Sequence, residues 1–368
     1  MTQFALGTIP LTTSGPALAA MIQSQRDANN TSHYGATEPS YKVKGMIWLD
    51  DSGTPWLLKI YDGSAWTQIG TFNATTDIFT PSMVALDPIY AKGLVQGRLT
   101  LESGVPVSFS DQLAKTNLYF TPYMGNGIAL FVSSQWVYRS FSEITESLSG
   151  LTTGKPYDVF AFDNAGTVDI ELLVWTNDTT RATALALQNG IHVKSGDATR
   201  RYLGTIYTSA TGQCEDSLKK RYVWNMYNRR LRGMAVYEAT DSWAYSITTI
   251  RQANGSALNQ LDFVRGLDEE EISAKISVMM SGTAGALMKV FFGLDVTNAK
   301  VAGSIAGNGN ASSGGFFQMI ALYDDLPGVG RHILTWLESS TATGTNTFFG
   351  DAGVPSAVQS GIIGNGMF

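Results

Sequence analysis

Basic and aromatic side chains gather between Lys194 and Arg232 and are the residues of this chain best suited to bind a charged group. Guanidinium groups pair with phosphates, and aromatic rings stack on bases. The same residue types also support a domain or subunit boundary, through bidentate carboxylate pairs and stacking. We favour this structural interpretation, and binding of an anionic glycan or of nucleic acid remains the alternative. The candidates are Arg200, Arg201, Arg221, Trp224, Arg229 and Arg230.

Residues able to perform catalysis or bind a metal form no recognisable pattern in the sequence. The densest acidic run, Asp268–Glu271, has consecutive carboxylates that point in different directions rather than a pair held at a fixed separation. The three histidines lie far apart, and a single cysteine excludes a Cys-rich zinc site. Asp163–Gly166 lacks the spacing of a calcium loop and is typical of a hairpin turn. We therefore predict no catalytic residue, no metal and no cofactor, and a protein that is not an enzyme.

Low charge is the main feature of the composition. Only 15% of the 368 residues are charged, against a typical ~25%, and 38 are glycine. Such a surface suits contacts between subunits, whose centre is depleted of charge. The net charge of −6 argues against a nucleic-acid partner. The sequence has no apolar run of 18 residues and no basic leader, so we expect neither membrane insertion nor a signal peptide. Cys214 is expected to be a small buried thiol.

A tryptophan-rich segment at 45–80 predicts a small β-unit followed by a polar linker that begins at about residue 71. Two short alternating runs are joined by Asp51–Gly53, and Asp62-Gly63 forms a second tight turn. So small a unit is not stable on its own apolar burial, so it must pack on a neighbour. The residues predicted to make that attachment contact are Trp48, Trp56, Tyr61, Asp62 and Trp66.

Residues 1–44 are predicted to form an arm that contains one helix, at 16–29. Pro16 suits the first turn of a helix, because a proline lacks only an N–H that would be unpaired there. Leu18, Met21 and Ile22 fall on one face of this helix. An isolated helix this short is marginal in water. We therefore expect the stripe to dock on a partner or on other copies of the chain.

The rest of the chain predicts two antiparallel β-sandwich-like domains, at 81–212 and 213–368, and the sequence leaves open whether these two regions form one domain or two. Strong hairpin signals lie at Ser133-Ser134 and at 164–167, and about eight strands with polar loops follow residue 215. Their regular spacing favours a jelly-roll-like C-terminal domain. Gly-, Asn- and Ser-rich segments near 307–315 and 339–347 are predicted to be flexible loops that contact a host-surface glycan. The fold class is thus mainly β.

Two motifs of the tryptophan-rich segment, Gly45–Asp50 (GMIWLD) and Lys59–Trp66 (KIYDGSAW), resemble an attachment module of tailed-bacteriophage fibre proteins. The module lies near the N-terminus of many such proteins. Further on, Lys194–Thr205 and Glu215–Arg229 are similar to segments that recur in phage virion proteins. The resemblance spans much of residues 1–265, and the last hundred residues have no such counterpart.

This resemblance implies a structural virion protein, assembled in the bacterial host cytoplasm. Its N-terminal segment would attach it to other virion proteins of the tail or capsid, and its distal β-domains would contribute to host attachment. Proteins of this kind are homo-oligomers, usually trimers. A tail fibre or tail-associated appendage is the favoured interpretation. The alternative is a head fibre that decorates the capsid, and a surface-polysaccharide depolymerase is a third possibility.

Overall fold

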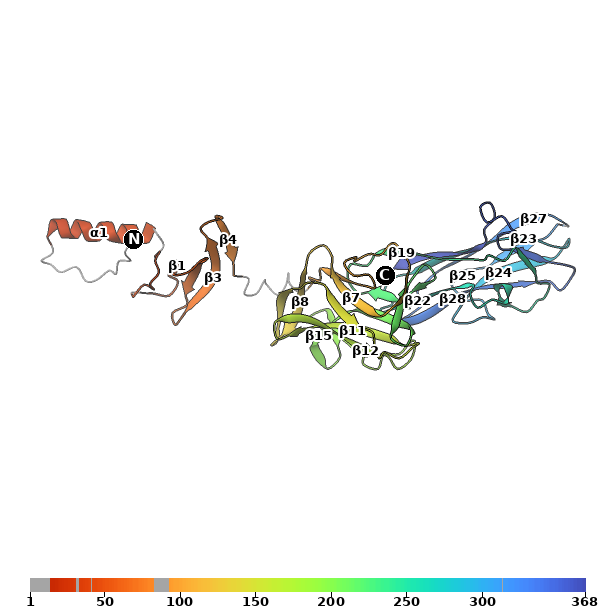
Figure 1. Cartoon of the computed structure of the whole chain (residues 1–368), viewed down its shortest axis with the longest axis horizontal. Coiled ribbons are helices and arrows are strands. Elements are labelled where there is room, and N and C mark those ends of the chain that lie inside the picture. The colour runs from red at the N-terminus through yellow and green to blue at the C-terminus, as the bar shows by residue number, and fades with distance from the viewer. Residues whose placement is uncertain (1–13, 31–32, 41, 83–92, 313) are drawn as a thin grey trace. The chain divides into compact units, whose positions relative to one another are not determined.

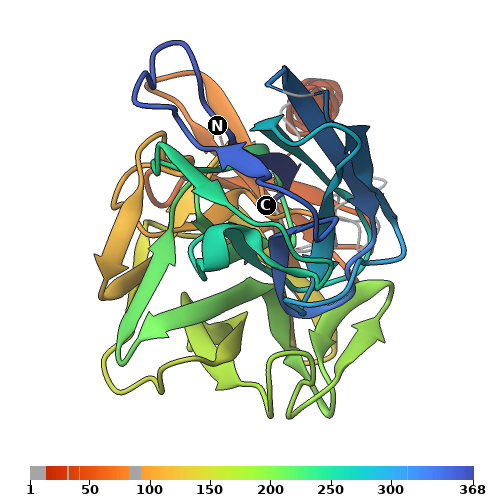
Figure 2. The same ribbon diagram turned by 90° about the vertical axis from the view of Figure 1, so that its right-hand side faces the viewer.

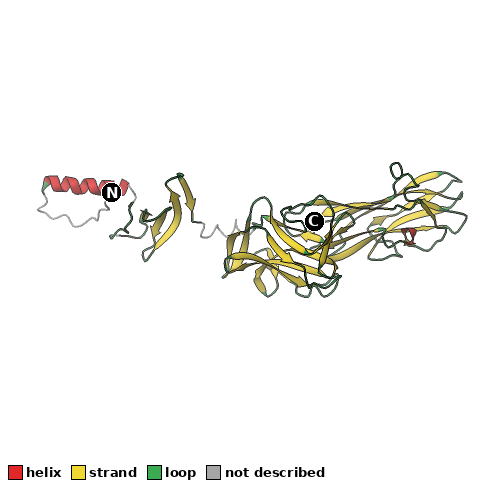
Figure 3. Ribbon diagram, viewed as in Figure 1, coloured by secondary structure: helices red, strands yellow, loops and turns green. Residues whose placement is uncertain are grey.

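The computed structural model describes residues 14–30, 33–40, 42–82, 93–312 and 314–368. The chain is mainly β, with 53% strand and 4% helix, which confirms the predicted fold class (Figure 3). It divides into two compact units, residues 1–87 and 88–368. In the described ranges, no helix combines the length and the hydropathy needed to cross a membrane.

The helix of the first unit is α1 (Gly15–Asn30), which corresponds to the helix predicted at 16–29. The N–H of Leu18 donates to the carbonyl of Ser14 at 2.9 Å, which closes the first turn. Leu18 and Met21 are partly exposed, and Ile22 is 55% exposed. The apolar stripe that the sequence predicted is therefore largely open to solvent.

The tryptophan-rich segment folds as a four-stranded antiparallel meander in the order β1-β2-β3-β4. Part of the predicted polar linker belongs to this sheet, because Asn73 accepts hydrogen bonds from the N–H groups of Thr75 and Thr76 and so reverses the chain. The returning strand pairs Phe79 with Phe72. The strands are β1 (Ile47–Asp50), β2 (Trp56–Tyr61), β3 (Trp66–Asn73) and β4 (Ile78–Pro81).

The second unit contains one long sheet of fourteen strands, which follows the path β12-β11-β15-β16-β17-β22-β28-β24-β26 (Figure 1). Its strands are β6 (Gln112–Lys115), β11 (Pro156–Asn164), β12 (Thr167–Val174), β13 (Leu185–Gln188), β14 (Ile191–Lys194), β15 (Asp197–Ala210), β16 (Gln213–Asp216), β17 (Lys220–Arg221), β18 (Val223–Asn225), β21 (Arg251–Gln252), β22 (Gln260–Arg265), β24 (Leu287–Leu294), β26 (Gly307–Asn310) and β28 (Gly330–Ser340).

A second sheet of seven strands follows the path β19-β30-β23-β27-β25, and two small sheets and a 3-10 turn complete the unit. The seven strands are β19 (Leu231–Tyr237), β20 (Ser242–Ala244), β23 (Ile272–Ser281), β25 (Ser304–Ile305), β27 (Phe316–Asp325), β29 (Thr347–Phe349) and β30 (Gly361–Met367). The small sheets are β10-β7-β5 and β8-β9, with β5 (Gly97–Thr100), β7 (Asn117–Pro122), β8 (Gly127–Val132), β9 (Gln135–Ser140) and β10 (Ile144–Ser147), and the turn is η1 (Ala253–Gly255).

The seven-stranded sheet and the C-terminal strands of the long sheet form the two layers of a β-sandwich. Strand β23 alternates buried and half-buried residues along its whole length, which is the period of two expected for a strand with one face in a core. Ile276 from this sheet and Phe292 and Trp336 from the long sheet are each fully buried in the shared core. Figure 2 views this end of the unit, with the sandwich strands coloured teal to blue.

The two predicted β-domains belong to one compact unit, since the boundary expected at 212/213 falls inside a hairpin. Strand β15 pairs with β16 across this point, with Thr208 opposite Cys214. The long sheet then continues through β17 into β22 by a parallel pairing. One hydrophobic core includes buried residues from both sides of the expected boundary.

Both predicted hairpins are present. Ala165 and Gly166 have φ values of 51° and 97°, as a type I′ turn between β11 and β12 requires, and Ser133-Ser134 joins β8 to β9. The loop predicted at 307–315 is only partly a loop, because Gly307–Asn310 forms β26 on the edge of β24. A Cβ at Gly307 would lie 2.4 Å from the carbonyl of Ile320, so this glycine allows a close approach that its sequence context does not reveal.

Candidate attachment unit and arginine-lined pocket

Three of the predicted attachment residues come together in the meander. The rings of Trp48 and Trp66 lie 5.2 Å apart and those of Tyr61 and Trp66 lie 5.3 Å apart, so the three form one aromatic cluster. Trp56 packs separately, 5.3 Å from Tyr34 and 5.8 Å from Phe72. Such ring pairs add stability beyond their area of burial.

Polar groups hold this aromatic cluster in place. The indole N–H of Trp48 donates to the carbonyl of Gly35 at 2.8 Å, and that of Trp66 donates to Glu38 at 2.9 Å. Lys59 lies over the Trp48 ring at 4.6 Å and pairs with the buried Asp50 at 2.7 Å. The cluster is therefore positioned by contacts that lie within the described part of the first unit.

Asp62, a predicted attachment residue, stabilises the turn between β2 and β3. Its Oδ1 accepts hydrogen bonds from the N–H groups of Ala65 and Ser64 and from the Ser64 hydroxyl. These bonds, led by the one from Ala65, lower the pKa of Asp62 to about 2. The side chain is thus an acceptor engaged within its own turn, and its position explains the Asp-Gly pair in the sequence.

The meander is a single layer with little apolar burial of its own. Among the described residues of β1–β4, Trp48 is the one large apolar side chain with an exposure below 9%, at 5%. Ile47, Ile78 and Phe79 are 41–58% exposed, and every residue of β4 is exposed. A sheet this small gains stability only when a second layer covers one of its faces.

Most of the predicted basic cluster is paired inside the second unit. Arg200 pairs with Glu171 at 2.9 Å and lies over the Phe162 ring, and Arg229 pairs with Glu269 at 2.8 Å. The acidic run at 268–271 is thus partly a partner for arginine rather than only a solvated loop.

Two further members of the cluster, Arg201 and Trp224, are fully buried. Arg201 donates to the carbonyl of Ala129 at 2.7 Å and stacks against the rings of Trp136 and Tyr227. The segment 217–228 contains strands β17 and β18. Trp224 therefore lies in a strand, and its ring stacks on Tyr202.

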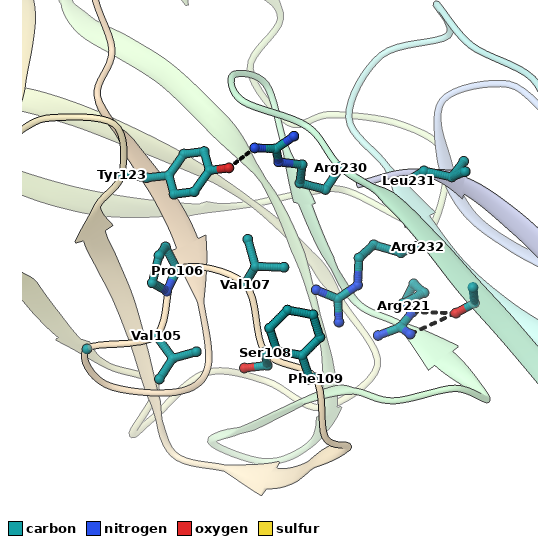
Figure 4. A pocket seen from close by; sticks show the side chains of 12 residues that line it. Val105, Pro106, Val107, Ser108, Phe109, Tyr123, Arg221, Arg230, Leu231 and Arg232 are labelled. Carbon is teal, nitrogen blue, oxygen red and sulfur yellow. Dashed lines mark hydrogen bonds between the residues drawn. The ribbon is translucent and has the colours of Figure 1, made fainter.

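Arg230 is the exception, because it lies on the surface at the rim of a pocket. Its guanidinium covers the ring of Tyr123 at 5.2 Å and donates to the Tyr123 hydroxyl (Figure 4). The pocket has a volume of about 750 Å³. Its lining residues are Gly104, Val105, Pro106, Val107, Ser108, Phe109, Tyr123, Arg221, Arg230, Leu231, Arg232 and Gly233.

Positive charge exceeds negative charge around this pocket. Asp216 is shared by Arg221, at 3.1 Å, and by Arg232, at 3.6 Å. Behind the pocket lies the buried Arg98, which donates to the carbonyl of Pro106 at 3.0 Å. Burial, and then the charges of Arg232 and Arg230, lower the pKa of Arg98 to about 10.

Sequence reasoning found Arg221 and Arg230 but not the pocket. Arg98, Phe109 and Tyr123 are more than a hundred positions away from Arg230, and no local motif connects them. The one available signal was Phe109, an aromatic residue in the polar context Ser108–Asp111, which is 98% exposed in the structure.

No metal centre is evident in the part of the chain that the structure describes. No group of three or more His, Cys, Asp or Glu side chains is placed there to hold a metal ion. The two larger described cavities are lined by no carboxylate. The absence of enzymatic activity stays a prediction.

The sequence matches no protein family model and no curated protein sequence. Among solved structures, it is similar to the insecticidal delta-endotoxin Cry8Ea1 from Bacillus thuringiensis, with 8% identity, a TM-score of 0.23 and coverage of 74% of this chain. The chain spans about half (52%) of the endotoxin's length.

Two further structures have equally low scores. The VP2 subviral particle of infectious bursal disease virus matches with 12% identity and a TM-score of 0.23, covering 74% of this chain and 77% of VP2. A glycoside hydrolase family 43 arabinoxylan arabinofuranohydrolase from Bacillus subtilis matches with 12% identity and a TM-score of 0.20, covering 86% and 82%. Likenesses this weak support no conclusion on function.

Proposed function

We propose that this chain is a structural protein of a tailed-phage particle, namely a tail fibre or a tail-associated appendage. Its N-terminal unit would attach it to the particle. The observation that carries the proposal is the single-layered aromatic meander, whose strands leave Ile47, Ile78 and Phe79 exposed. Its sequence resembles the attachment module of phage fibre proteins. Covering these side chains would contribute about 25 cal/mol per Å² of apolar surface removed from water.

Removing residues 1–82 tests the attachment. We expect phage particles assembled with the shortened chain to lack it, whereas the purified fragment keeps its β-sheet circular dichroism because residues 88–368 have their own core. The measurement is immunodetection of the chain in purified particles. Normal incorporation of the shortened chain would contradict the proposal.

We also propose that the appendage is a homo-oligomer, expected to be a trimer, in which the outer face of the seven-stranded sheet packs on neighbouring copies. One row of neighbouring residues crosses four strands of this face, in the order Ile305, Leu322, Lys275 and Ile363. Ile320 and Tyr237 follow in the next row, through Ser277 and Gly361. We call the five apolar residues of these rows, together with Phe316, the apolar face.

The size and charge of the apolar face suit a contact between copies. Its six side chains are 36–67% exposed, and since large side chains bury about 150–250 Å² each, they present on the order of 600 Å². Standard interfaces bury about 800 Å² per partner. Lys275 and Asp324 on this face have opposite charges and no salt bridge to each other among the described ion pairs, so each can meet its counterpart on a second copy.

A further inference from the structure

We propose that the arginine-lined pocket binds an acidic sugar, a pyranose that carries a carboxylate, through Arg230 and Arg232. The inference rests on the proposed function, because it names the kind of surface ligand that such an appendage would contact. Figure 4 shows both guanidinium groups at the pocket, with Tyr123 beside Arg230.

The charge around the pocket is unbalanced. Three arginines line the pocket, Arg221, Arg230 and Arg232, and the first and third share the carboxylate of Asp216. In the described ranges, Arg230 has no carboxylate within salt-bridge distance, and its tip is held by a neutral hydroxyl. A ligand carboxylate would therefore supply the negative charge that this rim lacks, in a charge-assisted pair.

The pocket also has an apolar lining. Val105, Val107 and Leu231 line it, together with Phe109, which is 98% exposed. The C–H face of a pyranose ring is apolar and can cover such a surface, which removes it from water. The volume of about 750 Å³ lies within the ~300–1,000 Å³ of small-ligand sites, so a short oligosaccharide has room.

An extended peptide that would add a strand at this point is disfavoured. Strand β19 borders the pocket, and two of the backbone groups on its free edge are already used. The carbonyl of Gly233 accepts from Arg221 at 2.7 Å, and the N–H of Ala235 donates to Leu218 at 2.8 Å. Strand addition requires an open row of backbone groups. Recognition here therefore depends on side chains, as it does for a sugar.

The test compares a charged and a neutral ligand on the full chain. Isothermal titration would measure the affinity for a galacturonic acid trimer and for a neutral galactose trimer, with wild type, Arg230→Gln and Arg200→Gln. Arg200 is the matched control, because it lies outside the pocket and pairs with Glu171. We expect wild type to prefer the acidic trimer at least tenfold, Arg230→Gln to weaken that binding at least tenfold, and Arg200→Gln to change it less than twofold.

Several results would overturn the inference. These are equal affinity for both trimers, equal losses in the two variants, or no heat of binding at 10 mM acidic trimer. Tighter binding of a single-stranded oligonucleotide of the same charge would show that the ligand is a nucleic acid and not a sugar. Incorporation of Arg230→Gln into particles separates the two proposals, because attachment through the N-terminal unit does not involve this pocket.

Discussion

At the scale of single residues, Glu338 is the most unusual group, a carboxylate with no exposed surface inside the sandwich. One of its oxygens accepts hydrogen bonds from Arg251 at 2.9 Å and from the N–H of Asn254 at 3.1 Å, and the other accepts from the Trp243 indole at 2.7 Å. Burial nevertheless raises the pKa of Glu338 to about 7, because these donors offset only part of the lost hydration.

This pKa predicts a pH dependence of stability. The folded state keeps a proton on Glu338 that the unfolded state, with its usual pKa of 4.5, has released at pH 5–7. The bound proton therefore stabilises the folded state fully below pH 4.5. This stabilisation is lost as the pH rises through 7, which lowers the free energy of unfolding by about 3 kcal/mol. Glu338→Gln cannot titrate, so relative to this variant wild type should lose about 3 kcal/mol of unfolding free energy between pH 4 and pH 8.

Urea unfolding followed by tryptophan fluorescence at pH 4, 6 and 8 measures this difference. The new amide faces the Trp243 donor and lowers the stability of the variant. This loss of unfolding free energy is the same at each pH, so it cancels in the comparison. A difference between wild type and variant that does not change with pH would contradict the assigned pKa.

Single-residue roles were predicted unevenly from the sequence. Residue type alone indicated that the arginines would pair with carboxylates, as Arg200 and Arg229 do. It could not indicate that Arg201 is fully buried or that Arg230 is on a pocket rim, because both depend on partners far away in the chain.

At the scale of elements, the meander depends on one tryptophan. Trp48 is its buried anchor, and large-to-small substitutions of buried aromatic residues cost about 3–5 kcal/mol. We expect Trp48→Ala to unfold the meander, with loss of amide dispersion for residues 47–81 in NMR spectra and unchanged signals for 93–368. Phe79→Ala is the control, because this side chain is 48% exposed and should leave the sheet intact. A dispersed meander in Trp48→Ala would show that the anchor lies elsewhere.

Elements with alternating apolar residues were predictable, and those made by distant pairing were not. Strand β24, for example, has the local apolar sequence LMKVFFGL, which by itself is typical of a strand. Strand β30 was missed, because its sequence GIIGNGM has three glycines, which disfavour strands. It forms because β19 and β23 pair on both its sides, and a Cβ at Gly361 would lie 2.3 Å from the carbonyl of Val236.

At the scale of the whole molecule, the apolar face predicts self-association. Ile320→Lys with Ile363→Lys places two cations on this face, and we expect the variant to be monomeric where wild type is oligomeric. Sedimentation velocity measures the mass, and Leu187→Lys, at an exposed apolar position of β13, is the control. A monomeric wild type at 100 µM, or a variant that keeps the wild-type mass, would contradict the proposed packing.

The mainly β class of the whole molecule followed from its composition and from the alternation of apolar residues. Its division into domains did not. Turn residues and short alternating runs indicated a mainly β chain. The sequence alone does not distinguish the hairpin at 212/213 from a domain boundary, because a Thr-Gly turn looks the same whether it ends a domain or joins two strands of one sheet.

Cys214, the one thiol in the sequence, is fully buried, and its Sγ lies 3.2 Å from the carbonyl of Tyr207. Burial raises its pKa, so it stays protonated and shielded from alkylating reagents. A cysteine introduced at an exposed position would then be the single reactive handle on the folded chain. One fluorophore per copy could be attached there without first removing the native sulfur, and counting dyes on single particles would give the number of copies directly.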